Sequence, residues 1–509
     1  MDHPRLAGLL LASLLLLSGC GSPEVGPPVA TLSPAPASEA PQTQVFTLPR
    51  TQESLHPILS TDKVNLALSG LLWEGLFELD QSFQPQSVLC QNYWVSEDGL
   101  TWSFLPRTGV TFSDGSPLTA DDVVASLELA RSPSSRFAGR LSGVQRVDAA
   151  GGVVTITLSA PNGALPALLD IPIIREGDGN IPLSTGPYIL TQTGEGAALT
   201  ARSGWWQGKA LPAETIPLVT IPAADDLIYA FDTGDISLVA ADLTGTGALG
   251  FAGDHEVWDY PSTTMVYLGY NCARGPCADA ALRRALDRAW DRNTVAVALF
   301  SRHAQASALP AHPASPLYDE DLDQRRGYST QEFEALLDQA GYTRDQEGSW
   351  NRDRSALELT FVVNTDNTFR LAAAEYLAGE LTRLGIAVDL KKLPWGDYVQ
   401  ALERGNFDLY LGATALTADF NPAPLLTGSL NYGGYWNSQT NALLGAYQAA
   451  YGEMRVSTAT ALWAALESEV PFSTLCFTNQ SVLTQWGTVS GLTPTQQNPF
   501  YGIESWSVA

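Results

Sequence analysis

Residues 357–420 constrain the fold more than any other stretch of this sequence. "LELTFVV" alternates apolar residues at Leu357, Leu359, Phe361 and Val363, as a strand does, and a helical run follows from about Phe369 to Leu384. "IAVDLK" then predicts a second strand, "DYVQALER" a shorter helix and "FDLYLG" a third strand. Strands joined through helices run parallel, because a parallel pair needs a crossover connection. This stretch therefore predicts a parallel α/β unit.

Three loops follow the strands of this unit. They are "NTDNT" at 364–368, "LPWGD" at 393–397 and "ATALTADFNPAP" at 413–424. Ligands of open α/β sheets bind beyond the carboxyl ends of the strands, which is where these loops lie. The third loop is longer than a connection requires, and longer loops are often functional. We therefore expect a binding site at this edge.

Helices elsewhere carry their own start signals. "TADD" at 119–122 is a capping box, and we attribute its paired acids to capping rather than to acid/base catalysis. Asp279 is the expected N-cap of "DAALRRALDRAWDR", and Ser329 with Glu332 frames a helix that Gly341 ends. The body thus mixes helices and strands throughout.

Length and charge narrow the class of protein. The 509 residues exceed what one hydrophobic core usually supports, so at least two domains are expected. The formal net charge of −26 disfavours nucleic acid and anionic membrane surfaces as partners. Removal of residues 1–19 would delete one Arg and one Asp and leave this charge unchanged.

The first residues look like an export signal. The apolar run Leu6 to Leu17 is too short to span a bilayer, which takes roughly 20 apolar residues, and suits a signal peptide. It ends in Leu17-Ser18-Gly19-Cys20, which resembles the lipobox of bacterial lipoproteins, where the cysteine is lipidated and becomes the first residue. The alternative is an ordinary signal peptide with a chance cysteine. Residues 20–44 are rich in Pro, Ala and Gly and predict a flexible linker between anchor and body.

Motifs for catalysis and metal binding are mostly missing. The sequence holds no HExxH, GxSxG, GxxxxGK[ST] or complete GxGxxG signature, and its histidines do not pair at metal-ligand spacing. His56 is interpreted as structural rather than as a nickel or haem ligand. Cys90 and Cys476 are expected to be free buried thiols, whereas Cys272 and Cys277 are close enough in sequence to pair. We expect neither an enzyme nor a bound cofactor or metal.

An ordered set of motifs carries a family resemblance. In chain order these are "LLWEGLFELD" (71–80), "WVSEDGLTWSF" (94–104), "GVTFSDGSPLTADDVVAS" (109–126), "STGPY" (184–188), "ALRRALDRAWDRNTV" (281–295), "LLDQAGY" (336–342) and "FDLYLGATALTADFNP" (407–422). The chain resembles the solute-binding proteins of ABC importers that carry peptides and related solutes, the oligopeptide and dipeptide binding proteins, over residues from about 45 to 500.

The resemblance implies a two-lobed periplasmic-binding-protein-like α/β fold, a large type II binding protein whose first lobe is discontinuous. Signal peptide and linker would occupy 1–19 and 20–44. The chain would cross between lobes near Tyr270-Asn271 and Thr478-Asn479. The first lobe would then comprise 45–270 and 479–509, and the second lobe 271–478.

The resemblance also implies ligand-binding residues. In peptide-binding members an aspartate in the loop that "TADFNP" resembles pairs with the ligand's α-amino group, so Asp419 is the matching position. A surface or capping aspartate is the alternative. The other candidates, each with a packing or structural alternative, are Trp395, Trp73, Glu74, Asn364, Asp366 and Asn367.

The predicted function is a receptor, held at the extracytoplasmic face of the cell membrane through Cys20, that delivers short peptides to an ABC permease and ATPase. It is expected to act as a monomer and to bind no nucleic acid. One alternative keeps the importer and changes the cargo to a nickel chelate, haem or an oligosaccharide. Another is an extracellular hydrolase or a structural surface protein.

Overall fold

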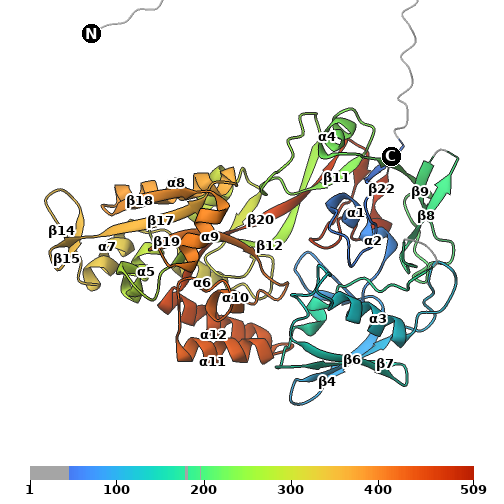
Figure 1. Ribbon diagram of the computed structural model, residues 1–509, viewed down its shortest axis with the longest axis horizontal. Coiled ribbons are helices and arrows are strands. Elements are labelled where there is room, and N and C mark those ends of the chain that lie inside the picture. Colours follow the sequence, from blue (N-terminus) through green and yellow to red (C-terminus); the bar gives the residue numbers. More distant parts are fainter. Residues whose placement is uncertain (1–44, 178–180, 195, 509) are drawn as a thin grey trace, which may run out of the picture. The chain divides into compact units, whose positions relative to one another are not determined.

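The computed structural model describes residues 45–177, 181–194 and 196–508 (Figure 1). The predicted signal peptide, the lipidated Cys20 and the linker up to residue 44 lie outside the described residues. None of the helices in the described ranges is both long and apolar enough to cross a bilayer.

The predicted parallel unit is present in the largest sheet. Its strand order is β11-β20-β12-β19-β17-β18, with β13 paired to β20. β17 runs parallel to both β18 and β19, as the sequence predicted, and β19 runs antiparallel to β12. The strands are β11 (Leu238–Ala241), β12 (Glu256–Tyr270), β13 (Ala304–Ala306), β17 (Glu358–Asn364), β18 (Ala387–Leu393), β19 (Leu409–Ala415) and β20 (Phe472–Thr484).

Helices cover both faces of this sheet (Figure 1). Leu359, Phe361 and Val363 of β17 pack into one core, whereas Val362 packs into the core on the other face. Both faces of β17 are therefore buried, because a hydrophobic core covers each face of the sheet. The helices are α5 (Ala280–Leu286), the π-helix η3 (Thr294–Leu299), α6 (Glu320–Arg325), α7 (Thr330–Gln339), α8 (Thr368–Arg383), α9 (Trp395–Glu403), α10 (Ala423–Leu426), α11 (Ser438–Ala449) and α12 (Met454–Glu469). We call this part the second lobe, without β11 and the portions of β12 and β20 that pack in the first-lobe core. It also includes the short turn η2 (Pro276–Ala278) and the small sheet β14 (Thr343–Arg344), β15 (Trp350–Arg352) and β16 (Ser355–Ala356).

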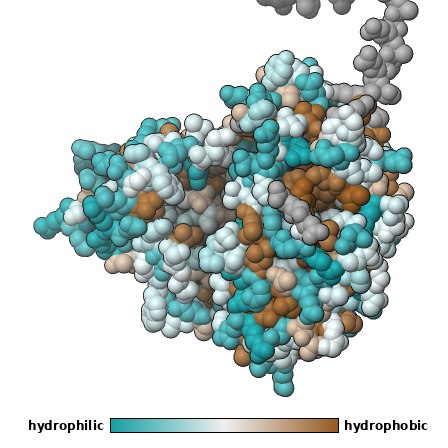
Figure 2. All heavy atoms as spheres, turned by 45° about the vertical axis from the view of Figure 1, so that its right-hand side comes forward, coloured by the Kyte–Doolittle hydropathy of each residue, from teal (hydrophilic) through white to brown (hydrophobic). Residues whose placement is uncertain are grey.

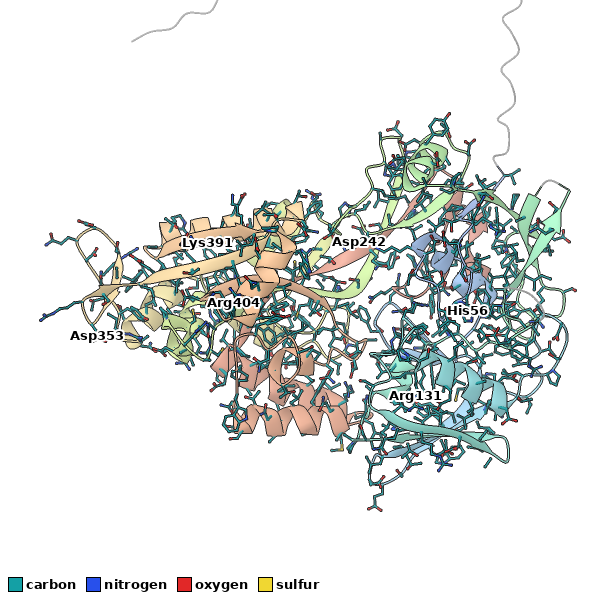
Figure 3. The ribbon with its side chains drawn as sticks, in the orientation of Figure 1. His56, Arg131, Asp242, Asp353, Lys391 and Arg404 are labelled. Atoms are coloured by element: carbon teal, nitrogen blue, oxygen red, sulfur yellow. The ribbon has the colours of Figure 1, made fainter. Side chains whose placement is uncertain are left out.

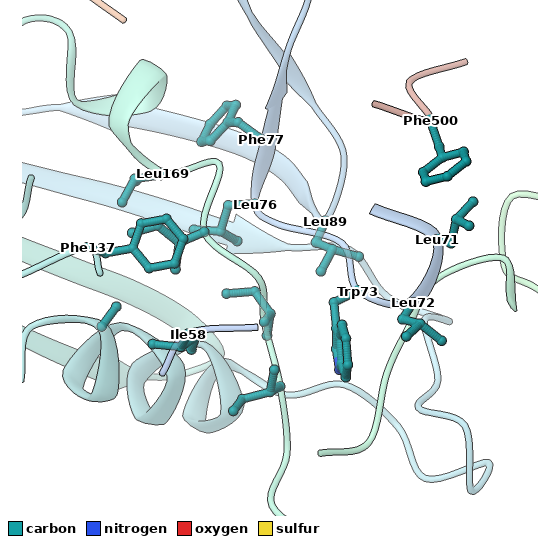
Figure 4. Close-up of a cluster of buried hydrophobic side chains, with 14 of the residues drawn as sticks. Ile58, Leu71, Leu72, Trp73, Leu76, Phe77, Leu89, Phe137, Leu169 and Phe500 are labelled. Atoms are coloured by element: carbon teal, nitrogen blue, oxygen red, sulfur yellow. The ribbon is translucent and has the colours of Figure 1, made fainter. Parts of the chain in front are cut away.

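The first lobe holds two four-stranded sheets, in the orders β1-β10-β9-β8 and β4-β5-β7-β6. One core joins them, and Figure 4 shows part of it around Trp73, Phe77 and Phe137. The strands are β1 (Leu48–Arg50), β2 (Phe77–Leu79), β3 (Pro85–Ser87), β4 (Cys90–Val95), β5 (Thr101–Pro106), β6 (Val144–Ala150), β7 (Val153–Leu158), β8 (Tyr188–Thr193), β9 (Gly196–Ala201) and β10 (Thr215–Thr220). The helices are α1 (Lys63–Ala67), α2 (Ser69–Leu72), α3 (Ala120–Ala130), η1 (Leu165–Leu168) and α4 (Ala224–Asp232).

The end of the chain returns to the first lobe. Phe500, Ile503 and Trp506 pack into the same core as residues near the start of the body, such as Phe46 and Leu48. The returning elements are β21 (Val489–Ser490), η4 (Ile503–Ser505) and β22 (Ser507–Val508). The first lobe is thus discontinuous in sequence, and the fold is a two-lobed α/β fold. On the face drawn in Figure 2, hydrophilic side chains cover much of the periphery.

Two long paired strands, β12 and β20, pass through both lobes. Tyr260 of β12 packs in the first-lobe core, whereas Met265 packs in a second-lobe core, and the register of the pair shifts between Pro261 and Met265. We propose that the first crossing lies there, ahead of the predicted Tyr270-Asn271, which is at the end of β12. The predicted second crossing at Thr478-Asn479 lies between Phe477 and Val482, which also belong to different cores.

Local start signals behave as the sequence predicted, with one difference. Thr119 and Asp122 form the capping box of α3, and Ser329 accepts the Glu332 N–H at the start of α7. Asp279 caps α5, but the helix ends at Leu286 rather than continuing to residue 292. Beyond it, the buried Asp287 carboxylate binds the guanidinium of Arg292, a contact that the turn after α5 makes possible.

The cysteines of the body are free thiols. Cys90 and Cys476 are fully buried, which confirms their prediction, and burial raises the pKa of Cys90 to about 11. Cys272 and Cys277 are not joined in this structure.

Candidate functional site

The carboxyl ends of β17 and β18 are tied together by hydrogen bonds. Asn364, the last residue of β17, is buried, and its side-chain amide lies 3.4 Å from the carbonyl of Leu393 at the end of β18. The N–H of Thr365 donates to the same carbonyl at 3.0 Å. Asn364 also accepts the N–H of Asp366 at 3.1 Å. These contacts fix the loop that follows β17 and leave Asp366 exposed.

Asn367 connects this edge to the loop after β11. It caps α8 by accepting the N–H of Arg370 at 2.9 Å, and its amide donates to the carbonyl of Thr244 at 2.8 Å. Arg370 donates to the hydroxyl of Thr246 at 3.0 Å. The edge of the second-lobe sheet therefore faces residues 242–247, and Asn367 is a connecting residue with its amide already in use.

Charges of both signs gather between these segments. Burial lowers the pKa of the Arg370 guanidinium, while Tyr398, Asp242 and Asp366 favour its charged form. Asp242, labelled in Figure 3, follows β11 and accepts the N–H of Thr244 at 3.2 Å. This edge thus carries one guanidinium and two carboxylates that influence it electrostatically, without an ion pair among them in the described residues.

Trp395 begins α9, directly after β18, and 58% of it is exposed. Its ring lies 5.8 Å from that of Tyr398, at an interplanar angle of 32°. The core-packing alternative therefore does not describe Trp395. An exposed indole at a strand's carboxyl end offers a flat apolar surface and one N–H donor.

Asp419 lies after β19, as expected, but its carboxylate already has partners. The residue is 4% exposed, and its Oδ2 pairs with the guanidinium of Arg455 at 3.2 Å. Its Oδ1 accepts the hydroxyl of Thr417, and its backbone carbonyl accepts the hydroxyl of Tyr447. A ligand ammonium at this carboxylate would have to share it with Arg455 or displace that side chain.

Trp73 and Glu74 belong to the first lobe, away from this edge. Trp73 is a core residue (Figure 4), and its indole N–H donates to the carbonyl of Leu183 at 3.2 Å. This placement corresponds to its packing alternative. Glu74 accepts the indole N–H groups of Trp205 and Trp206, at 3.2 and 2.7 Å, and the amide of Gln207 at 2.9 Å. Both residues line a cavity of about 570 Å³ built from first-lobe residues.

His56 is held by its own turn. Its Nδ1 accepts the backbone N–H groups of Ile58 and Leu59 at 3.2 and 3.3 Å. This contact fits the structural interpretation of His56. Within the described ranges, no group of three or more His, Cys, Asp or Glu side chains is arranged to hold a metal ion.

Sequence reasoning missed Phe83, a first-lobe residue that packs among second-lobe rings. Its ring lies 4.9 Å from Phe420 and 5.5 Å from His312. The turn that presents it is held by Asp80, which accepts the N–H groups of Ser82 and Gln84 at 2.9 Å each. The Asp80-Gln81-Ser82 sequence signals the turn, but no local pattern reveals the distant partners of Phe83.

The comparison with family models decides the class of the protein. The model described as bacterial extracellular solute-binding proteins, family 5 Middle, matches residues 84–437. The chain belongs to this family. Its structure agrees, with two lobes joined by two crossing strands and a polar sheet edge opposite a loop of the other lobe.

Known relatives differ in the solutes that their names give. The oligopeptide-binding protein AppA of Bacillus subtilis is 23% identical over 419 residues, which cover 76% of this chain and 77% of the relative. The unliganded open form of the periplasmic murein tripeptide binding protein MppA superposes with a TM-score of 0.77 at 18% identity, over 92% of this chain and 98% of that one. A nickel ABC transporter structure from Bacillus halodurans gives 0.74 at 19% identity, over 90% and 98%. These structural likenesses show the shared fold, and all three proteins are named for binding or transport.

Proposed function

We propose that this solute-binding protein captures short peptides outside the cytoplasm and delivers them to an ABC permease and ATPase. We further propose that it acts as a monomer, held at the extracytoplasmic face of the cell membrane by a lipid on Cys20. The lipobox-like sequence and the linker at 20–44 support the anchor. Replacement of Cys20 by Ser should move the protein from the membrane fraction to the medium or periplasm, and an unchanged membrane fraction would contradict the anchor.

The observation that carries the peptide proposal is the charge arrangement at the second-lobe edge. A short peptide carries an ammonium at one end and a carboxylate at the other. Asp242 and Asp366 supply negative charge and Arg370 supplies positive charge, close to loops of both lobes. In a site from which water is excluded, such pairs gain far more than they do at an open surface.

Aromatic and amide groups complete the proposed site. Trp395 offers an exposed ring against which a peptide side chain can pack. The amides of Asn364 and Asn367 already bind backbone carbonyls, so we assign them the positioning of the loop rather than direct capture. Closure of the lobes around cargo would follow from contacts that only the closed form makes.

Asp419 enters this proposal with a changed role. Because Arg455 already balances its charge, Asp366 is the better candidate for the ligand's ammonium. Asp419 then serves to hold Arg455 and the loop after β19. Its direct pairing with a ligand amine stays a prediction.

Native mass spectrometry of the chain lacking residues 1–20 tests the peptide proposal. The mass excess of gently ionised over denatured protein should form a series that fits short peptides. An Asp366→Asn variant should lose most of this excess, because it removes a charge at the proposed ammonium site. Asp389→Asn, on the outward part of β18, is the matched control and should keep it.

One outcome would contradict the peptide cargo, and another would contradict its assignment to the second-lobe edge. A single excess mass that fits no peptide would keep the receptor and assign it another solute, such as a metal chelate, haem or an oligosaccharide. Equal loss of cargo in the Asp389→Asn control would show that the effect of Asp366→Asn is not specific to the edge.

A further inference from the structure

The first-lobe cavity described above lies between two sets of segments that are distant in sequence. One wall comes from α2, β2 and β3, and the other from residues 205–209 and 497–504. Its volume of about 570 Å³ falls in the range of small-molecule sites. It is separate from the second-lobe edge, because its lining residues come from the first lobe.

Two carboxylates line this cavity without a cationic partner. Among the described residues, no ion pair joins Glu74 or Glu78. Glu74 is bound by the neutral N–H groups of Trp205, Trp206 and Gln207, and Glu78 by the amide of Asn498. Both oxygens of Glu74 therefore have donors, whereas Glu78 has one hydrogen bond and keeps an oxygen for a further donor.

A second observation is independent of these two carboxylates. Ser69 lines the cavity, is only 5% exposed, and its hydroxyl has no partner in the described part of the chain. Asp170 also lines the cavity, and while its Oδ1 pairs with Arg140, its Oδ2 has no partner there. Buried polar atoms are nearly always hydrogen-bonded in native proteins. The Asp170 oxygen thus lacks a donor, and the Ser69 hydroxyl, which can donate or accept, lacks a partner of either kind.

Apolar groups of the wall suit such a donor, and the cations of the wall have contacts of their own. The rings of Trp73, Trp206 and Phe500 face the cavity and suit an apolar body or a cation over an indole. The lining cations are already engaged. Lys209 pairs with Glu504, while Arg107 and Arg136 donate to the carbonyls of Val88 and Pro57 and lie over Trp206 and Phe137.

We propose that the first-lobe cavity binds a small organic cation, a primary ammonium on an apolar body, between Glu74 and Glu78. The ammonium has three donors, which Glu78, Glu74 and the Ser69 hydroxyl accept, and its body packs on the indoles of the wall. This site is additional to peptide capture at the second-lobe edge and does not depend on it.

The proposal carries a pH signature. Burial raises the pKa of Glu78 to about 7, the hydrogen bond from Asn498 opposes this, and the charges of Glu74 and Glu504 add to it while Lys209 opposes it. Tyr501 is the other titratable group facing Glu78, and its pKa is itself raised by burial. A cation that prefers ionised Glu78 should therefore bind about tenfold more tightly at pH 8 than at pH 6.

Isothermal titration calorimetry of the chain lacking residues 1–20 tests this with benzylamine and its neutral analogue benzyl alcohol. We expect one benzylamine per chain at pH 8, about tenfold weaker binding at pH 6, and no saturable binding of the alcohol. Glu78→Gln should weaken amine binding at least tenfold and remove the pH dependence. Glu97→Gln, the same change at an exposed turn, should bind as the unaltered chain does.

Several results would overturn the proposal. They are absence of amine binding, equal binding of the alcohol, and unchanged binding by Glu78→Gln. Binding that survives Glu78→Gln but disappears in Asp366→Asn would place the amine at the second-lobe edge instead. Peptide capture is measured separately in Glu78→Gln, so loss of one site is distinguishable from loss of the other.

Discussion

Asp287 in the second lobe and Glu78 in the first are both buried carboxylates, but their charged neighbours differ in sign. Asp287 is fully buried and pairs with Arg288, Arg292 and Arg326, at 3.0, 2.6 and 2.8 Å. Despite its burial, these cations hold its pKa well below the usual range. Glu78 has an amide for a partner and a second carboxylate nearby, and its pKa is raised to about 7. The charge of Asp287 is thus balanced by cations of the chain itself, whereas Glu78 can still bind a cation from solution.

The comparison predicts the largest effect at Asp287. Asp287→Asn would leave three guanidinium groups without their shared anion, two of them almost fully buried. We expect a loss of about 3–5 kcal/mol in the free energy of unfolding, measured by urea denaturation. Asp353→Asn, in an exposed turn labelled in Figure 3, is the control and should change it little. Equal stability of the Asp287 variant would show that the cluster contributes nothing net to folding.

Asp419 tests the intermediate case of one carboxylate and one cation. Asp419→Asn removes the charge opposite Arg455 but keeps oxygen and nitrogen atoms for hydrogen bonds. We expect a loss of about 2 kcal/mol in the free energy of unfolding by the same method. Peptide affinity should fall less than in Asp366→Asn. The reverse order of the two affinities would restore Asp419 as the residue that binds the ligand's amine.

Glu78 should show an effect of the opposite sign, because its charge is destabilising in the folded chain. Its pKa is raised in the folded chain from 4.5 to about 7, so the folded state holds a proton that the unfolded state releases between these values. Stability therefore falls as pH rises from 4.5 to 7 and stays lowered above 7. Glu78→Gln should remove this loss and stabilise the protein by up to about 3 kcal/mol at pH 8, with no gain below pH 4.5. Urea midpoints across this range, with Glu97→Gln as control, measure it. A variant less stable at pH 8 would mean that the ionised carboxylate is already compensated.

The parallel unit and its edge were predictable because their signals are local. Apolar alternation and Gly385 mark the strands and helix ends of 357–420, and parallel order follows from the crossovers alone. The predicted strand ends also placed Asp366 and Trp395 just beyond the carboxyl ends of two strands, and the structure has them there.

Residues whose environment depends on distant segments were not predictable in this way. The sequence around Asp419 does not predict its ion pair with Arg455, which lies on a helix 36 residues further along the chain. Trp73 and Glu74 carry a family motif, but the core and Trp205 with Trp206 decide what they contact. Phe83 sits in a recognisable turn, whereas its partners come from the other lobe. Residue type and spacing locate an element, and only tertiary packing assigns its partners.

The register shift between Pro261 and Met265 has a consequence for how the two lobes unfold and bend. β12 and β20 contribute side chains to both cores, so the lobes share one hydrogen-bonded ladder and melting of one removes strand partners from the other. At the shift, the ladder is interrupted and the Ser262 hydroxyl instead donates to the carbonyl of Thr478 at 2.6 Å. A strand bends and twists more strongly at such an interruption, while its pairing continues on either side. The same strand pair thus couples the unfolding of the two lobes and also contains the irregularity at which the path of the strand changes between their cores.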